Sequence, residues 1–119
     1  MAIAVKRKLS GSTDGCGIKI VKTSTDGTMI HTAIAGTTAG TFDEIWLYAY
    51  NGHTTDVTLT IEFGGATVPD QNIIKTLQSK TGLELIVPGL ILQNALTVKA
   101  FASVANVVTI TGFVNQITD

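Results

Sequence analysis

Side chains alternate between apolar and polar along most of this 119-residue chain, and this period of two is the feature that most restricts its fold. Val57, Leu59 and Ile61, for example, alternate with threonine and glutamate. Such alternation places apolar side chains on one face of a strand and polar side chains on the other. No stretch keeps a helical period over several turns, so the pattern predicts an all-β protein.

Turn residues separate the alternating segments, among them Asn51-Gly52, Gly64-Gly65 and Pro88-Gly89. Many short strands with turns at this spacing are typical of an antiparallel β-sandwich or jelly roll. A chain of this length builds one core, so we expect a single domain over residues 1–119. The expected strands are 2–9, 17–23, 28–35, 42–50, 56–64, 83–87, 90–93, 95–102 and 107–117, with 72–80 as either a strand or a short helix.

The tetrapeptide STDG occurs twice, at residues 12–15 and 24–27. A strand of about seven residues between the copies would hold Asp14 and Asp26 more than about 20 Å apart, so they cannot share an ion within one chain. Asp-Gly before alternating apolar residues is a strong hairpin signal, since glycine takes positive φ readily. We therefore expect two hairpin turns at the ends of a strand over 17–23, which would start a meander.

The chain carries no pattern that favours an enzyme, a metal site or a cofactor site. His31 and His53 lack the further ligands that zinc requires, and we expect both to be structural or surface residues. Cys16 has no base nearby in the sequence for nucleophilic catalysis. Asp43 and Glu44 are adjacent and should point to opposite faces of a strand, which is wrong for paired acid–base work. We expect no catalytic, cofactor-binding or metal-binding residues.

The charge content argues against polyanionic partners. Charged residues form 14% of the chain and the formal net charge is −1, against about 25% charged residues in an average domain. This balance gives no general attraction to nucleic acid or to an acidic membrane. Cys16 is the single cysteine, and the first charges follow a short apolar stretch, the reverse of a signal peptide. We expect a protein made in the cytoplasm.

The strand FDEIWLYAYN, residues 42–51, is apolar or aromatic on both faces. Ile45, Leu47 and Ala49 share one face, and the aromatic side chains share the other: Trp46, Tyr48 and Tyr50. A two-layer sandwich buries only one face of each sheet. Either a loop covers the aromatic face, or it is a subunit or partner interface, where aromatic residues are enriched. The low charge favours the interface, and a sugar-binding platform is a third alternative.

The one basic cluster is Lys6-Arg7-Lys8, within an expected strand. Alternation sends Arg7 to one face and the two lysines to the other. Charges of this kind protect an edge strand from unwanted pairing. Residues 1–10 are therefore interpreted as an edge strand or a docking arm, with Lys6, Arg7 and Lys8 as candidate contact residues.

Several segments resemble the small virion structural proteins of tailed bacteriophages. They are KRKLSGSTDG near the start, TMIHTAIAGTT, DEIWLYAYN, VTLTIEFGG, GLELIVPGLIL and VKAFASVANVVTITGFVNQI. The likeness spans nearly the whole chain and consists of turns and strand patterns. It implies a non-enzymatic capsid decoration or cement protein on the virion surface, a homo-oligomer whose partners are the major capsid protein or other virion proteins. The alternatives are a neck or tail component of the virion, or a carbohydrate-binding β-sandwich module.

Overall fold

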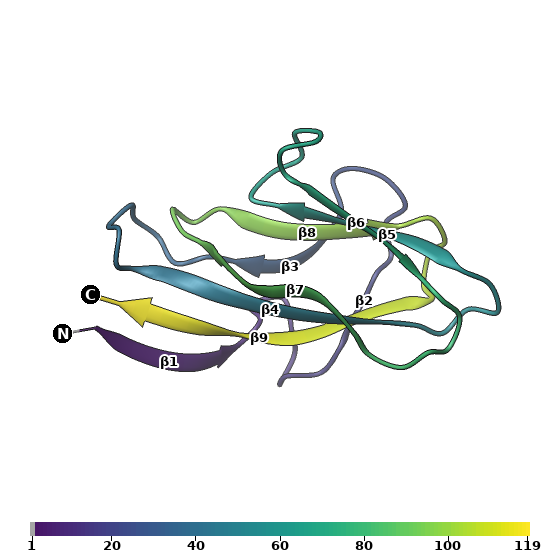
Figure 1. Ribbon diagram of the computed structural model, residues 1–119, viewed down its shortest axis with the longest axis horizontal. Helices are drawn as coiled ribbons and strands as arrows, with labels where there is room; N and C mark the ends of the chain where they lie inside the picture. Colours follow the sequence, from purple (N-terminus) through teal and green to yellow (C-terminus); the bar gives the residue numbers. More distant parts are fainter. Residues whose placement is uncertain (1) are drawn as a thin grey trace.

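Residues 2–119, which a computed structural model describes, form nine strands and no helix, so none of these residues belongs to a helix that could cross a membrane (Figure 1). Met1, the first residue of the expected arm, lies outside the described residues. The strands are β1 (Ile3–Lys8), β2 (Ile18–Lys19), β3 (Thr28–Thr32), β4 (Phe42–Asn51), β5 (Val57–Phe63), β6 (Asn72–Leu77), β7 (Glu84–Leu92), β8 (Thr97–Ala102) and β9 (Val108–Thr118).

Two antiparallel sheets pack face to face, which confirms the expected all-β sandwich. Sheet A has the order β1-β9-β4-β7, with β2 also paired to β9, and sheet B has the order β3-β8-β5-β6. Four of the pairings are nested along the chain: β2 with β9, β3 with β8, β4 with β7, and β5 with β6. The chain is thus one long antiparallel hairpin that is rolled up, so that successive strand pairs lie alternately in sheet A and in sheet B. This arrangement is a jelly roll.

The hairpin expected at the first STDG is wrong, although its turn chemistry is right. Cys16 N–H donates to Thr13 O at 2.9 Å, and Asp14 and Gly15 both have positive φ, 56° and 86°, as a tight Asp-Gly turn requires. However, β1 and β2 do not pair with each other. Both pair with β9, one after the other along the same edge. The expected strand 17–23 is reduced to Ile18–Lys19, which pair with β9, and Ile20 N–H adds a hydrogen bond to Val108 O at 2.9 Å.

The second STDG is not a hairpin either, since the following strand β3 pairs with β8. This segment crosses from sheet A to sheet B, and a buried carboxylate holds it. Gly27 N–H donates to Glu62 Oε1 at 2.6 Å, and the Thr25 hydroxyl donates to Glu62 Oε2. A Cβ atom on Gly27 would lie 2.5 Å from the Ala100 carbonyl group. Glycine is needed here for close backbone approach.

Two other expected boundaries change. The segments 83–87 and 90–93 form one strand, β7, which continues through Pro88-Gly89. Proline is tolerated there because β7 is an edge strand and its outer side needs no donor. The ambiguous segment 72–80 is a strand, β6, over its first six residues, paired with β5 in a local hairpin.

A buried polar network joins both sheets at one end of the core. His31 Nε2 lies 2.6 Å from Asp43 Oδ2, and both side chains are almost completely buried. Ser10 N–H donates to His31 Nδ1 at 3.0 Å, so the ring hydrogen that faces Asp43 is on Nε2. Gln116 Nε2 donates to the other Asp43 oxygen at 3.1 Å. His31 is therefore buried and held by hydrogen bonds, as expected for a structural residue, and its two partners, Ser10 and Asp43, come from separate segments.

We predict that His31→Ala lowers the free energy of unfolding by about 3–5 kcal/mol, because Asp43 would stay buried without its imidazole partner. Chemical denaturation would measure the change. His53→Ala is the matched control, since His53 bonds the side chains of Asn51 and Ser79 only through its own backbone N–H and carbonyl oxygen, which alanine retains. It should change the free energy by no more than about 0.5 kcal/mol. Equal effects of the two substitutions would contradict the structural role of His31.

The backbones of β9 and β4 come very close at Gly112. A Cβ atom on Gly112 would lie 2.0 Å from the backbone oxygen of Trp46. Gly112→Ala should therefore destabilise the fold by about 1–3 kcal/mol through overpacking, measured by thermal or chemical unfolding. Gly52→Ala is the control, because its nearest atoms lie at 3.4 Å and beyond. A neutral Gly112→Ala would mean that the two central strands separate at little cost.

Candidate functional site

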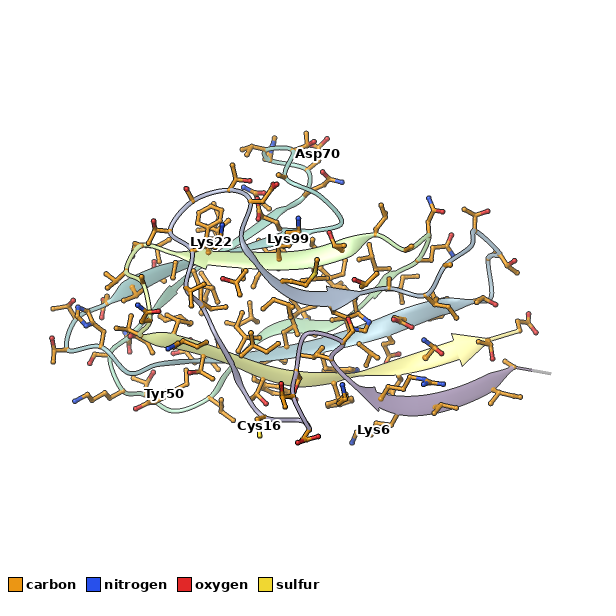
Figure 2. All side chains as sticks on the ribbon, turned by 180° about the vertical axis from the view of Figure 1, so that it is seen from behind. Lys6, Cys16, Lys22, Tyr50, Asp70 and Lys99 are labelled. Carbon is orange, nitrogen blue, oxygen red and sulfur yellow. The ribbon has the colours of Figure 1, made fainter. Side chains whose placement is uncertain are left out.

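The outward side of β4 carries the aromatic side chains that the sequence singled out. Ile45, Leu47 and Ala49 are fully buried between the sheets, whereas Trp46, Tyr48 and Tyr50 are half-buried on the opposite side. All three rings keep part of their surface exposed, so no segment of residues 2–119 covers them completely. Figure 2 shows Tyr50 and Lys6 along the same side of the molecule.

Trp46 is the centre of a stacked cluster. Its cross-strand neighbour on β9 is Phe113, and the two rings are nearly parallel, 14° apart, with centroids separated by 6.2 Å. The Lys6 ammonium lies 4.2 Å from the Phe113 centroid, a cation–π contact. Sequence reasoning missed Phe113. Its outward position follows from alternation in β9, but its pairing with Trp46 depends on the register of two strands far apart in the chain.

Two polar side chains complete this surface. Trp46 Nε1–H donates to Glu44 Oε1 at 2.8 Å, and Asn115 Nδ2 donates to the same oxygen at 3.1 Å. The hydrogen bond from Trp46, followed by that from Asn115, lowers the pKa of Glu44 because both stabilise the carboxylate. Glu44 is outward and Asp43 is inward, as their adjacency predicts. We name the set Glu44, Trp46, Tyr48, Tyr50, Phe113, Asn115 and Lys6 the aromatic face.

The basic cluster divides as its alternation predicts. Lys6 and Lys8 lie opposite Asn115 and Phe113 on the outward side of sheet A, and Arg7 lies opposite Val114 on the inward side. All six residues of β1 are exposed, so sheet B does not cover its inward side. Lys8 Nζ donates to the backbone oxygen of Ser12 at 3.1 Å. Of the three cations, only Lys6 contributes to the aromatic face.

Apolar surface continues from the aromatic face onto the edge strand β7. Leu85 lies opposite Tyr48 and is 47% exposed. Pro88 lies opposite Trp46, and a Cβ atom on the neighbouring Gly89 would be 2.8 Å from the indole ring. Glycine at this position lets the indole ring lie close to the backbone of β7. The result is an uncovered apolar surface that crosses β9, β4 and β7.

The remaining candidates form no chemical centre. No group of three or more His, Cys, Asp or Glu side chains within residues 2–119 is placed to hold a metal ion. Cys16 is exposed. His31 and Asp43 are enclosed in the core, where no substrate reaches them.

Comparisons of the chain with protein-family models, curated proteins and solved structures find no match.

The hydrogen bonds of Glu44 predict a low-pH transition at Trp46. The pKa of Glu44 is lowered in the folded protein, so its carboxylate stabilises the fold at every pH above the ordinary pKa of glutamate. This stabilisation is lost as the pH falls through the lowered pKa. Trp46 is the single tryptophan, so its emission should change with a midpoint below the ordinary pKa of glutamate.

Glu44→Gln should abolish this transition, and Glu84→Gln, a substitution of an edge-strand carboxylate on β7, should retain it. A midpoint at or above the ordinary glutamate value, or a transition that persists in Glu44→Gln, would contradict the assignment.

Proposed function

We propose that this chain is a non-enzymatic structural protein of a phage virion that binds the capsid lattice as a decoration or cement protein. The observation that carries the proposal is the partly exposed aromatic face on sheet A, centred on the stacked pair Trp46 and Phe113. Aromatic side chains are enriched at protein–protein contacts, and here they lie beside two charged side chains, Glu44 and Lys6. Such a face requires no catalytic group.

Three further points support this proposal. The resemblance to virion proteins covers the segments that form most of the strands, including both strands of the Trp46–Phe113 pair. Jelly rolls recur in viral capsid domains, although a fold alone does not assign a function. The low charge content leaves much of the surface able to pack against protein.

The mechanism is adhesive. Burial of apolar surface contributes about 25 cal/mol per Å², and a lattice repeats each contact many times, so a modest contact in each copy adds up to a stable shell. The partner is the major capsid protein or another virion protein, and the chain acts at the virion surface. Lys6 adds a cation at the edge of the face, where a partner carboxylate could pair with it.

Trp46→Ser should weaken binding to matching empty capsids by about tenfold or more, as expected for an aromatic anchor. Co-sedimentation with capsids measures the binding, and a thermal melt verifies that the variant is folded. Ile74→Ser on β6 is the control, since Ile74 is 63% exposed and belongs to sheet B. Wild-type protein that does not bind capsids would overturn the decoration role. Co-purification with tails instead would move the protein to the neck or tail.

A carbohydrate-binding module is the second candidate, because Glu44 and Asn115 lie beside Trp46. Lectin domains also use jelly rolls, and sugars stack on aromatic rings while polar side chains bind their hydroxyls. A titration of Trp46 fluorescence with sugars separates the candidates. A saturable change with a sugar, together with no capsid binding, would favour the carbohydrate module.

A further inference from the structure

The turn that follows β1, residues 9–12, is attached to the edge strand β3 of sheet B. Ser10 N–H donates to His31 Nδ1 at 3.0 Å, and Thr32 N–H donates to the Ser10 hydroxyl oxygen at 2.7 Å. Leu9, at the start of the turn, is 1% exposed and belongs to the hydrophobic core. The turn therefore ties the first strand of sheet A to sheet B.

Apart from this turn, little holds β1 in place. It pairs with β9 alone, at the outer edge of sheet A (Figure 1). All six of its residues are exposed. A strand with exposed side chains and one paired edge belongs to the least stable part of a fold. The attachment of the turn to β3 is therefore the main barrier to release of β1.

The hydrogen bonds of His31 fit only one protonation state of its ring. A backbone N–H can only donate, so Nδ1, which accepts from Ser10, carries no hydrogen, and Nε2 carries the hydrogen that faces Asp43 Oδ2 at 2.6 Å. A proton added to Nδ1 would place two donors opposite each other, one on the ring and one on the backbone of Ser10. His31 is 4% exposed, so solvent does not screen this conflict. Protonation of Nδ1 and the bond from Ser10 therefore exclude each other.

Asp43 on β4 is the ionisable side chain that faces His31. Its other oxygen accepts from Gln116 of β9, which is uncharged, and Val98 lies opposite His31 on β8. The cations of β1 make no ion pair with Asp43 in the described part of the chain, where its ionic partner is His31. Because Nε2 donates to Asp43 whether or not Nδ1 is protonated, the added proton disturbs the Ser10 side of the ring.

We propose that His31 is a proton-sensitive latch, and that protonation of Nδ1 releases the turn of residues 9–12 and β1 from the sandwich. Histidine is the side chain that ordinarily changes charge between pH 5 and 8. The released form binds one proton more than the closed form, so acid favours release, by about tenfold for each pH unit once the free imidazole is protonated. Release withdraws Leu9 from the core and uncovers the edge of β9.

Amide hydrogen exchange followed by NMR tests the latch. The background is His53→Gln, which leaves His31 as the single histidine. Between about pH 7.5 and pH 5.5, the protection factors of Ser10 and Gly11 should fall by about tenfold. Gly11 N–H donates to the Ile30 carbonyl oxygen, so its exchange reports release of the whole turn. The amides in the pairing of β4 with β9 should keep their protection.

His31→Gln is the matched variant, because glutamine can donate and accept but takes up no proton in this range. Its protection factors at Ser10 should not depend on pH. Ser10→Ala keeps the backbone N–H that donates to His31 and should retain the pH dependence, although it loses the bond from Thr32.

The nitrogen chemical shifts of the imidazole ring give a readout that needs no substitution at His31. They should show a hydrogen on Nε2 alone at neutral pH, and hydrogens on both nitrogens over the range in which Ser10 loses protection. Three results would each overturn the proposal: a doubly protonated ring with Ser10 still protected, loss of protection while the ring is still neutral, or no change in either before the whole protein unfolds.

Discussion

The antiparallel pairing of β4 with β9 is the interaction on which the rest of the structure depends. It runs without a break from Phe42 opposite Ile117 to Asn51 opposite Val108. Side chains alternate with a period of two, so a shift of one residue would exchange the faces of the shifted strand. In the observed register Leu47 enters the core and Trp46 meets Phe113 outside. One register thus decides both the packing of the sandwich and the composition of its exposed surface.

Buried carboxylates hold the connections that hydrophobic packing alone would leave free. Glu62 accepts hydrogen bonds from Thr25 and Gly27 and so fixes the crossing between β2 and β3. Asp43 is held by His31 of sheet B and Gln116 of sheet A and so connects the two sheets. Each buried carboxylate has satisfied partners, as burial of such a group requires. Asp43 faces the core and Glu62 lies beneath the crossing segment on the outward side of sheet B, so both are structural, whereas Glu44 lies on the outward side of sheet A.

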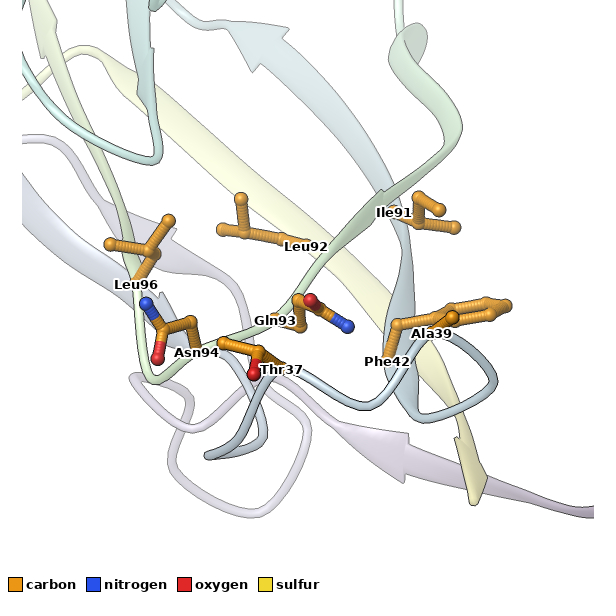
Figure 3. A pocket seen from close by; sticks show the side chains of 8 residues that line it. All are labelled: Thr37, Ala39, Phe42, Ile91, Leu92, Gln93, Asn94 and Leu96. Atoms are coloured by element: carbon orange, nitrogen blue, oxygen red, sulfur yellow. The ribbon is translucent and has the colours of Figure 1, made fainter. Parts of the chain in front are cut away.

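The surface has two apolar regions with different shapes. The aromatic face is broad and crosses three strands, and it suits a partner that also presents a flat surface. The groove at the end where β4 begins is concave and has uncharged walls (Figure 3). A chain with 14% charged residues has few charges to separate such regions, which is consistent with a protein that works in an assembly.

The sequence by itself determined which segments are strands and which side chains share a face. The two faces of β4, the split of Lys6 and Lys8 from Arg7, and the separation of Asp43 from Glu44 all followed from the period of two, which is a local property of the chain. Tertiary structure alone decided which strands pair. A turn signal such as STDG is local and predicts a hairpin between neighbouring segments. The flanking strands pair instead with β9 and β8, which lie far away along the chain. Backbone hydrogen bonds are alike for every residue and so do not select a strand's partner. The register is selected by burial of the apolar side chains in the complete sandwich, and it brings Trp46 to Phe113 and His31 to Asp43.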